Sequence, residues 1–461
     1  MQEKSAQYIK MMETPISKLV LSLSVPTIIS MLVTSLYNMA DTYFVSHLGT
    51  DASAAVGIVF SVQSLMQAVG FGLGMGSGSL ISMYLGRRDS KTAQKYASSS
   101  FAAAFVFGII LLIIAVLDID NMMLLFGADK NTLPYTRDYG FFILVGAPLM
   151  CSSFTLNNTL RSQGKAKLAM IGLTTGGILN ILLDPIFIYD RWLGFGTKGA
   201  AIATILSQSV SFCILFCLLK FGDNEVKLDL KTVSTKISDY FLIIKTGLPT
   251  VCRQGLASVA TTLINRQARI YGSAVVAAVT ISTKIYLIVR NAVIGIGQGY
   301  QPVSGYNYGA KRYDRVKKSF WVATFYGTII VIAATFVFYF LSDDLIKLFR
   351  KDDFDVIKFG SLGLRFYCLS LPFMAYSTYV NQLFQSLGKV KRATFLAACR
   401  NGIFYIPLVY ILAGLFKIKG ILLVQPIADV LTFAVSIPFN ILFFKELDSE
   451  AQADSALNEQ S

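Results

Sequence analysis

Charged residues are scarce in this chain of 461 residues, since Asp, Glu, Lys and Arg make up 15% of it. A typical soluble domain has about 25%. The charges also avoid long windows such as 99–117, 199–219 and 321–341. A membrane-spanning helix needs ~20 predominantly apolar residues, and 54% of this chain is hydrophobic. The lack of charge therefore excludes a soluble globular protein and predicts a polytopic α-helical membrane protein.

Histidine is also nearly absent, with His47 as its one occurrence, and the six cysteines show no CxxC spacing. The chain has neither an HExxH nor a GxSxG motif, so no nucleophile–base pair or metal constellation supports an intramembrane enzyme. We predict that the protein is not an enzyme and needs no cofactor. We expect His47 to border a loop and the cysteines to be reduced packing residues, namely Cys151, Cys213, Cys217, Cys252, Cys368 and Cys399.

The apolar segments predict twelve transmembrane helices. Their expected ranges are 18–46, 53–82, 94–117, 139–159, 168–189, 199–219, 240–270, 275–304, 319–341, 359–384, 393–414 and 420–444. The polar first fifteen residues show no cleavable signal peptide. The polar stretch 446–461 is typical of a disordered, solvated tail.

The net charge of +14 raises the alternative of a nucleic-acid-binding protein, and the positions of the charges argue against it. Loops on the side of the N-terminus hold more than twice as many lysines and arginines as the opposite loops. Basic loops mark the cytoplasmic face of a membrane protein. We therefore predict a multi-pass protein of the cell inner (plasma) membrane with both termini in the cytoplasm, in contact with the lipid bilayer and not with nucleic acid.

The chain is an internal duplication. Residues 19–95 match residues 242–318 at a constant offset of 223 without a gap, and GKAKLA (164–169) matches GKVKRA (388–393) further on. This pattern predicts an N-terminal six-helix lobe at 1–220, a cytoplasmic linker at 221–239 and a C-terminal six-helix lobe at 240–445. Six is even, so both lobes insert with the same topology. Parallel repeats of this kind occur in secondary transporters, with sites near the bilayer midplane.

The stretch GFGLGMGSG at 70–78 is rich in glycine but is not a nucleotide-binding loop. It lacks the GxGxxG pattern and follows no predicted β-strand. Gly70, Gly74 and Gly78 recur every four residues, which is typical of a helix face that packs closely against another helix.

Acidic residues are rare within the predicted spans, and two of them, Asp41 and Asp184, lie late in helices of the N-terminal lobe. Asn180 precedes Asp184 by four residues, so the two share a helix face, and Pro185 leaves the carbonyl of Ile181 without its usual donor. Oxygen ligands of this kind suit a hard cation such as Na⁺. Burial also favours the protonated form of a carboxylate, so the pair could carry H⁺ instead. A purely structural role, with the acids hydrogen-bonded to neighbours and a proline kink for packing, is the alternative.

The C-terminal lobe is basic within its spans and has Asp429 as an acid in the last one. Asp429 could pair with Arg400 or Arg253. One interpretation is an internal ion-pair network that stabilises the lobe. The other is a cavity in which Arg253, Arg290 and Arg400 hold anionic groups of a substrate.

These features together resemble the multidrug and toxic compound extrusion (MATE) family. The resemblance rests on PTIISMLVTSLYNMADTYFVSHLG (26–49), on NILLDPIFIY (180–189) followed by KGAAIATILSQ (198–208), and on the two six-helix halves. It implies an all-α membrane protein of twelve helices in two parallel six-helix bundles. It also implies an antiporter that expels a small amphipathic compound while Na⁺ or H⁺ enters.

The resemblance implies a cation site formed by Asp41, Asn180, Asp184 and Thr204, with a backbone carbonyl from Ala200. Candidates for the substrate cavity are Tyr37, Asn38, Arg253, Arg290, Arg400 and Asp429. We expect a monomer that alternates between outward and inward openings of a V-shaped pair of lobes. The alternative function is a flippase for a lipid-linked, phosphate-bearing substrate, which the arginines would suit.

Overall fold

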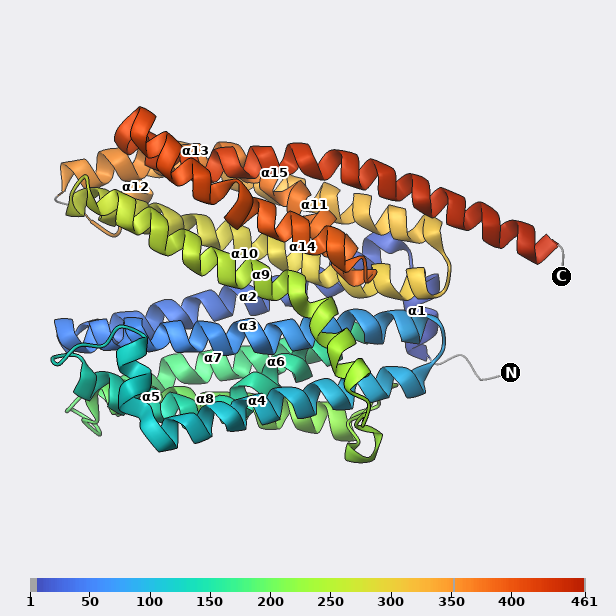
Figure 1. Ribbon diagram of the computed structural model, residues 1–461, viewed down its shortest axis with the longest axis horizontal. Helices are drawn as coiled ribbons and strands as arrows, with labels where there is room; N and C mark the ends of the chain where they lie inside the picture. The colour runs from blue at the N-terminus through green and yellow to red at the C-terminus, as the bar shows by residue number, and fades with distance from the viewer. Residues whose placement is uncertain (1–5, 351–352, 460–461) are drawn as a thin grey trace. The chain divides into compact units, whose positions relative to one another are not determined.

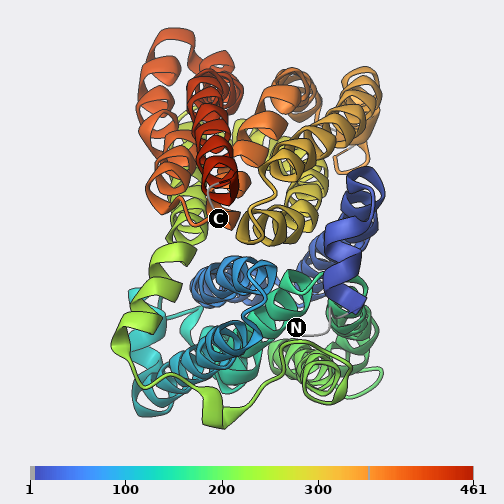
Figure 2. The same ribbon diagram turned by 90° about the vertical axis from the view of Figure 1, so that its right-hand side faces the viewer.

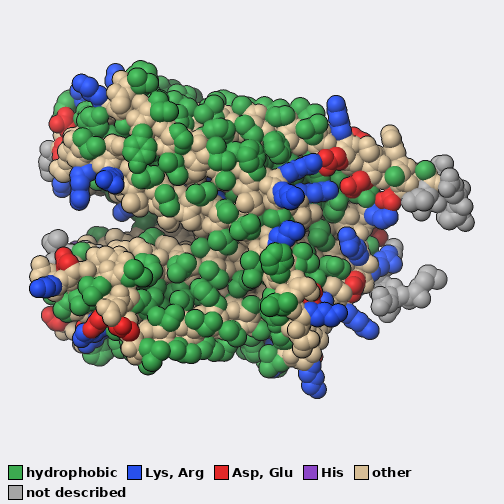
Figure 3. Space-filling view, viewed as in Figure 1, with side chains coloured by type: hydrophobic (Ala, Val, Ile, Leu, Met, Phe, Trp, Pro, Cys, Tyr) green, Lys and Arg blue, Asp and Glu red, His purple; other side chains and the backbone are tan. Residues whose placement is uncertain are grey.

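The computed structural model describes residues 6–350 and 353–459, and every regular element within those ranges is a helix (Figure 1). Charged side chains gather at the helix ends, while hydrophobic side chains cover the long sides of the helices (Figure 3). The elements up to residue 232 are α1 (Ala6–Glu13), α2 (Ile16–Ser46), α3 (Thr50–Gly86), α4 (Ser90–Leu125), α5 (Leu133–Val145), α6 (Ala147–Ser162), α7 (Ala166–Ile188), α8 (Gly196–Phe221) and the short η1 (Leu230–Thr232). The later ones are α9 (Ile237–Arg269), α10 (Ser273–Gly309), α11 (Tyr313–Phe340), α12 (Ser342–Lys347), α13 (Phe354–Ser386), α14 (Val390–Ala398), η2 (Cys399–Ile403) and α15 (Tyr405–Glu459).

The helices match the predicted spans. Within the described ranges, eight helices are long and apolar enough to cross a membrane, or nine if α5 and α6, bent by 50°, form one span. One of the eight, Val390–Ala456, contains two predicted spans, since the backbone leaves the helical conformation at Lys417, where φ is 52°. Helices α9 and α13 account for the other two predicted spans, and each has 33 residues.

The turn between the last two spans is tight. Gly420 lies so close to the chain before the turn that a Cβ atom there would collide with the carbonyl oxygen of Leu412. Glycine is therefore required at this close approach. The fourth predicted span bends where α5 ends at Gly146 and α6 begins with Pro148 in its first turn, because a proline there has no N–H with which to continue the helix of α5.

The chain divides into two compact units, and helices of each unit lie side by side in the end-on view of Figure 2. Unit 1 comprises Met1–Met12 and Val25–Val251, and unit 2 comprises Glu13–Ser24 and Cys252–Ser461. The division differs from the predicted boundaries at two places. The start of α2 belongs with unit 2, where Ser24 Oγ donates to the carbonyl of Ile296.

The predicted linker 221–239 is grouped with unit 1 and is held against α4. The backbone amide of Ser234 donates to Ser99 Oγ at 2.8 Å. Lys95 forms an ion pair with Asp239 at 3.0 Å, and hydrogen bonds from Ser234 and Lys95 lower the pKa of Asp239 against the opposing effect of burial. The charges of this segment therefore bind it to the helical unit.

The duplication is visible in the backbone. Asn157 Nδ2 donates to the carbonyl of Ala169 at 2.9 Å, and Asn381 Nδ2 donates to the carbonyl of Ala393 at 2.5 Å. Each of these hydrogen bonds closes a turn that contains a Gly-Lys pair, at 164–165 and at 388–389, and the sequence repeat aligns the two turns. Left-handed backbone conformations recur in the same register, at Gly49 and Gly272, Arg88 and Lys311, and Gly164 and Gly388.

The segment 446–461, predicted to be disordered, is helical as far as Glu459, and that prediction is wrong for the described residues. Residues 460 and 461 lie outside them. The acidic side chains of this segment pair with basic residues of unit 2, including Asp454 with Lys311 at 2.6 Å and Glu446 with both ends of the Arg392 fork. Arg392 lowers the pKa of Glu446. Glu446 and Asp454, two of the acids that made the segment look solvated, thus face basic side chains of unit 2.

The prediction for the cysteines is correct in part. All six are free. Cys151, Cys368 and Cys399 are buried, as packing residues should be, whereas Cys213 and Cys217 are exposed on α8. Those two are one helical turn apart, so they share the outer face of that helix.

The glycine stretch of α3 packs against two helices of unit 1. A Cβ atom at Gly70 or Gly74 would press on Phe154 and Asn158 of α6. A Cβ atom at Gly76 would collide with the carbonyl oxygen of Ile243 and lie 2.7 Å from the backbone nitrogen of Gly247, both on α9. The predicted role in close helix packing is confirmed for Gly70 and Gly74, whereas a Cβ atom at Gly78 would lie in ordinary contact with α6, at 3.6 Å from Asn158 and Ser162.

We expect Gly76→Ala to destabilise the protein, because the obstacle is backbone and cannot rotate away. Overpacking of this kind costs about 1–3 kcal/mol, and thermal melting of the purified protein in detergent should show a lower midpoint. The matched control is Gly57→Ala, also on α3, where a Cβ atom would meet nothing within 4 Å. Equal midpoints for the two variants would contradict the close approach of α3 and α9.

Candidate functional site

The acid site of unit 1 is built on α7. Asn180 and Asp184 lie one helical turn apart, and their side chains are 1% and 0% exposed. The glycines at 176 and 177 let neighbouring helices come close to this part of α7, because Cβ atoms there would press on Ser211 and Val33. The sequence thus places an amide and a carboxylate on a helix face that is fully covered.

Asn180 joins the acid to α8. Its Nδ2 atom donates to Asp184 Oδ1 at 3.1 Å and to Thr204 Oγ1 at 3.3 Å. Ala200, one turn before Thr204, is fully buried. The structure therefore brings together Asn180, Asp184 and Thr204, with Ala200 on the same helix as Thr204.

Asp41, on α2, is held by a residue that sequence reasoning missed. Tyr139 of α5 donates from its hydroxyl to Asp41 Oδ2 at 3.3 Å and is itself fully buried. Asp41 lies close enough to Asp184 for their charges to interact. Tyr139 opens the fourth predicted span, and nothing in its sequence context distinguishes it from the other 21 tyrosines.

Three oxygen atoms of the acid site are buried and have no hydrogen-bond partner, namely Asp41 Oδ1, Asn180 Oδ1 and Asp184 Oδ2. Leaving a buried acceptor unpaired costs about 1–3 kcal/mol, and more when it is charged. Oxygen atoms of this kind are ligands for a hard cation, and the two carboxylates can take protons instead. No group of three or more His, Cys, Asp or Glu gathers anywhere in the part of the chain that the structure describes, so a cation here relies on amide and hydroxyl oxygens as well as on the two acids.

Tyr37 and Asn38, proposed for the substrate cavity, lie beside this site in unit 1. Asn38 donates from Nδ2 to the carbonyl of Thr34 on its own helix at 2.8 Å. The ring of Tyr37 lies against Gly177 of α7. His47 is exposed beyond the end of α2, with Nδ1 3.0 Å from the carbonyl oxygen of Tyr43, which agrees with its predicted position at a loop.

A second buried cluster lies in unit 2, around Asp429 of α15. Arg400 Nε donates to Asp429 Oδ1 at 2.7 Å, and Arg400 Nη2 donates to the hydroxyl of Tyr286 at 2.8 Å. Of the two predicted partners, Asp429 pairs with Arg400. Arg400 lies in η2, a short π-helix, and such bulges inside helices are frequent at functional sites.

Three further donors complete the coordination of Asp429 and were not predicted. Tyr286 donates to Oδ2 at 3.1 Å and Gln425 donates to Oδ1 at 3.0 Å, while Ser370 Oγ lies 3.3 Å from Oδ2 and shares its one proton with the carbonyl of Tyr367 at 2.9 Å. Gln425 precedes Asp429 by four residues, the same spacing that identified Asn180 and Asp184. The four-residue spacing could have identified Gln425 from the sequence. Tyr286 and Ser370 come from other helices, so no local pattern in the sequence could have identified them.

Arg253 and Arg290 lie near this cluster without joining the ion pair. Arg253 of α9 and Arg290 of α10 are within electrostatic reach of each other and of Arg400. Arg253 Nη1 and Arg290 Nε are buried and have no hydrogen-bond partner. In the described part of unit 2, three guanidinium groups thus lie within electrostatic reach of one another, and one of them is paired with Asp429.

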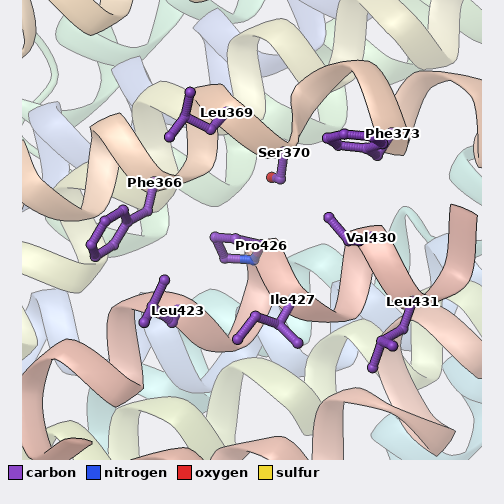
Figure 4. A pocket seen from close by; sticks show the side chains of 9 residues that line it. All are labelled: Phe366, Leu369, Ser370, Phe373, Leu423, Pro426, Ile427, Val430 and Leu431. Carbon is purple, nitrogen blue, oxygen red and sulfur yellow. The ribbon is translucent and has the colours of Figure 1, made fainter.

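An apolar pocket of about 290 Å³ lies between α13 and α15 of unit 2 (Figure 4). Leu369 and Val430, both in its wall, are 58% and 40% exposed, so the pocket opens on the outer surface of the unit. Ser370 is its one hydroxyl-bearing wall residue, and its hydroxyl also lies within hydrogen-bonding distance of Asp429. The pocket suits an apolar group and offers no charge of its own.

Comparison with known proteins settles the family. The family model described as MatE matches residues 26–186 and again residues 249–411, one match in each half of the repeat. The chain belongs to the MatE family. The family resemblance drawn from the sequence is thereby confirmed.

Relatives and solved structures of the family match nearly the whole chain. The multidrug export protein MepA of Staphylococcus haemolyticus is 25% identical over 422 residues, which cover 91% of this chain and 92% of MepA. An FAD transporter of Shewanella oneidensis is 23% identical over 435 residues, covering 91% of this chain and 93% of that protein. A structure of the outward-facing conformation of a multidrug resistance MATE family transporter has a TM-score of 0.91 at 27% identity, covering 97% of this chain and all of the other.

Family membership establishes the general class of the protein. It is a multi-pass membrane transporter and not an enzyme, as the sequence predicted. The twelve-helix fold class is likewise confirmed by the structural match.

Proposed function

We propose that the protein is a secondary active antiporter that expels small amphipathic organic compounds in exchange for Na⁺ or H⁺. The names of its relatives, a multidrug export protein and an FAD transporter, support transport of organic compounds, and the first of them supports export. The observation that carries the coupling is the set of three buried oxygens without partners on Asp41, Asn180 and Asp184. Their unmet hydrogen bonds favour an arriving cation or proton.

The geometry suggests how an ion acts on the protein. Asp41 lies on α2, whereas Asn180 and Asp184 lie on α7, and a cation bound by both acids ties these helices together. Helix α2 carries Pro26 in its interior, and such a proline weakens the helix and allows a bend. The ion and the organic compound then oppose each other's binding, and by linkage the opposition is equal in both directions. We place the protein in the plasma membrane as a monomer, with both termini in the cytoplasm.

Transport in proteoliposomes tests the proposal. The purified protein is reconstituted, and uptake of a fluorescent amphipathic probe is followed with an imposed sodium gradient or an imposed pH gradient, each applied alone. We expect one of the two gradients to drive the probe against its own gradient. Ethidium, a cation, and FAD, an anion, serve as parallel probes.

The control is Asp184→Asn in the same vesicles, which should respond to neither gradient. Movement of the probe at equal rates with and without every gradient would contradict coupling. It would favour the flippase alternative, in which no ion needs to move in exchange.

A further inference from the structure

The arginine cluster of unit 2 carries more positive charge than its surroundings neutralise. Among the residues that the structure describes, Asp429 is the one carboxylate in contact with it, and its two oxygens already accept hydrogen bonds from Arg400, Tyr286 and Gln425, with Ser370 Oγ 3.3 Å from Oδ2. A carboxylate offers about four acceptor positions. Most of its capacity is therefore used, and neither Arg253 nor Arg290 forms a hydrogen bond with it in the part of the chain that the structure describes.

Neither of those arginines can relieve the strain by losing its proton, because guanidinium stays charged in proteins. Both have a buried donor atom without a partner. Arg253 is repelled by Arg290 and Arg400, and Arg290 is repelled by Arg400 while it is also attracted by the charge of Asp429. Three like charges from α9, α10 and η2 are thus held together in a part of the unit that spans the membrane. An anion arriving among them would satisfy the unpaired donors and reduce the repulsion.

Arg253 and Arg290 have no arginine counterpart in the first half of the repeat. At the offset of 223 that aligns the halves, Ser30 stands at the position of Arg253 and Gln67 at that of Arg290. The shared architecture therefore does not need either guanidinium group. The first half carries the buried acid pair, and the second half carries the buried arginines.

We propose that Arg253, Arg290 and Arg400 form a binding site for the oxyanion group of the transported compound, so that this chain exports amphipathic anions. Phosphate and carboxylate both match the planar fork of arginine, and this shared chemistry defines the ligand. The proposal rests on the proposed function, since it names the substrate class of the same transporter. Arg400 stays paired with Asp429, which holds its side chain in position at the site. Arg253 and Arg290 supply the N–H donors that have no partner.

Equilibrium binding to the purified full-length protein tests this site with matched flavins. Riboflavin, FMN and FAD share one fluorescent ring system and differ in phosphate, so their fluorescence anisotropy isolates the contribution of the anion. We expect FMN and FAD to bind at least about 10-fold more tightly than riboflavin. The advantage should shrink as salt rises from about 50 mM to about 500 mM, because salt screens charge attraction.

The variants Arg253→Gln and Arg290→Gln should each lower the affinity for FAD by about 10-fold and leave riboflavin unchanged. Arg290→Lys keeps the positive charge but loses the planar fork of arginine. Its affinity for FAD should therefore lie between that of Arg290→Gln and that of the unchanged protein. The matched controls are Arg266→Gln on α9 and Lys284→Gln on α10, both exposed, which should bind as the unchanged protein does. Melting curves check that each variant is folded. Removal of an arginine that is repelled by its neighbours should not lower the melting midpoint.

Carboxyfluorescein and ethidium complete the test. Binding of carboxyfluorescein that depends on Arg290, without binding of FMN or FAD, supports the site and assigns it to carboxylates. Equal binding of riboflavin and FAD together with no arginine-dependent binding of carboxyfluorescein overturns the proposal. The proposal is also overturned if ethidium binds to the arginine variants more tightly than any of the anions binds to the unchanged protein.

The binding assay uses no gradient, so its failure is separate from failure of antiport. Arginine-dependent FAD binding without gradient-driven movement would contradict ion coupling and keep this site. Gradient-driven export of ethidium without any binding of anions would support ion coupling and contradict the anion site.

Discussion

Asp184→Asn is expected to abolish ion-coupled transport, with the initial rate of efflux falling by about 100-fold, and Asp41→Asn is expected to have a comparable effect. An amide in place of either acid can neither balance a cation nor accept a proton. Asp184 is fully buried and has a single hydrogen-bond donor, Asn180, on Oδ1. The substitution leaves the number of non-hydrogen atoms unchanged and alters the shape very little, so the loss reports charge.

The measurement is drug efflux from cells at matched expression, followed by transport in proteoliposomes. Asp190→Asn is the control, since that acid follows α7 directly and is exposed. Thr204→Val should give a smaller loss, because it removes one hydroxyl next to Asn180 and leaves both acids. Full activity in both acid variants would contradict the assignment of the coupling site to unit 1.

Local spacing predicted the part of this site that lies on one helix. Asn180 and Asp184 are four residues apart, and a four-residue interval places two side chains on one face whatever the tertiary structure. Family resemblance added Thr204 and Ala200, which the fold places on α8. Tyr139 could not be predicted, because its contact with Asp41 spans 98 residues of sequence and depends on how α5 packs beside α2.

The fold was predictable for the same reason that a membrane protein is simple to recognise. Each span must be a helix that satisfies its own backbone groups, so apolar runs determine the elements. The acidic segment after residue 445 was mispredicted, because composition distinguishes solvated from buried segments and does not show that Lys311 and Arg392 lie opposite the acids. The bend at Gly146 was missed because a 21-residue apolar run is equally compatible with a straight helix.

The second large effect is expected for Asp429→Asn, which leaves Arg400 buried without its carboxylate. Breaking a buried ion pair on one side costs about 3–5 kcal/mol, and Arg290 and Arg253 add their repulsion. The melting midpoint should fall strongly. The double variant Arg400→Gln/Asp429→Asn should recover most of the loss, because neither charge then remains unpaired.

Asp343→Asn is the matched control, since its ion pair with Arg365 at 3.0 Å is half-exposed and pairs of that kind contribute about 0–1 kcal/mol.

The Asp429→Asn variant also separates the two interpretations of the basic C-terminal lobe. A network that only stabilises the lobe predicts loss of stability in Asp429→Asn and no change in ligand affinity. An anion site predicts that Asp429→Asn, with Arg400 released from its pair, binds FAD more tightly and is stabilised by FAD more than the unchanged protein. Unchanged affinity for FAD in a folded Asp429→Asn protein would therefore contradict the presence of an anion among these arginines, even if the loss of stability were as large as expected.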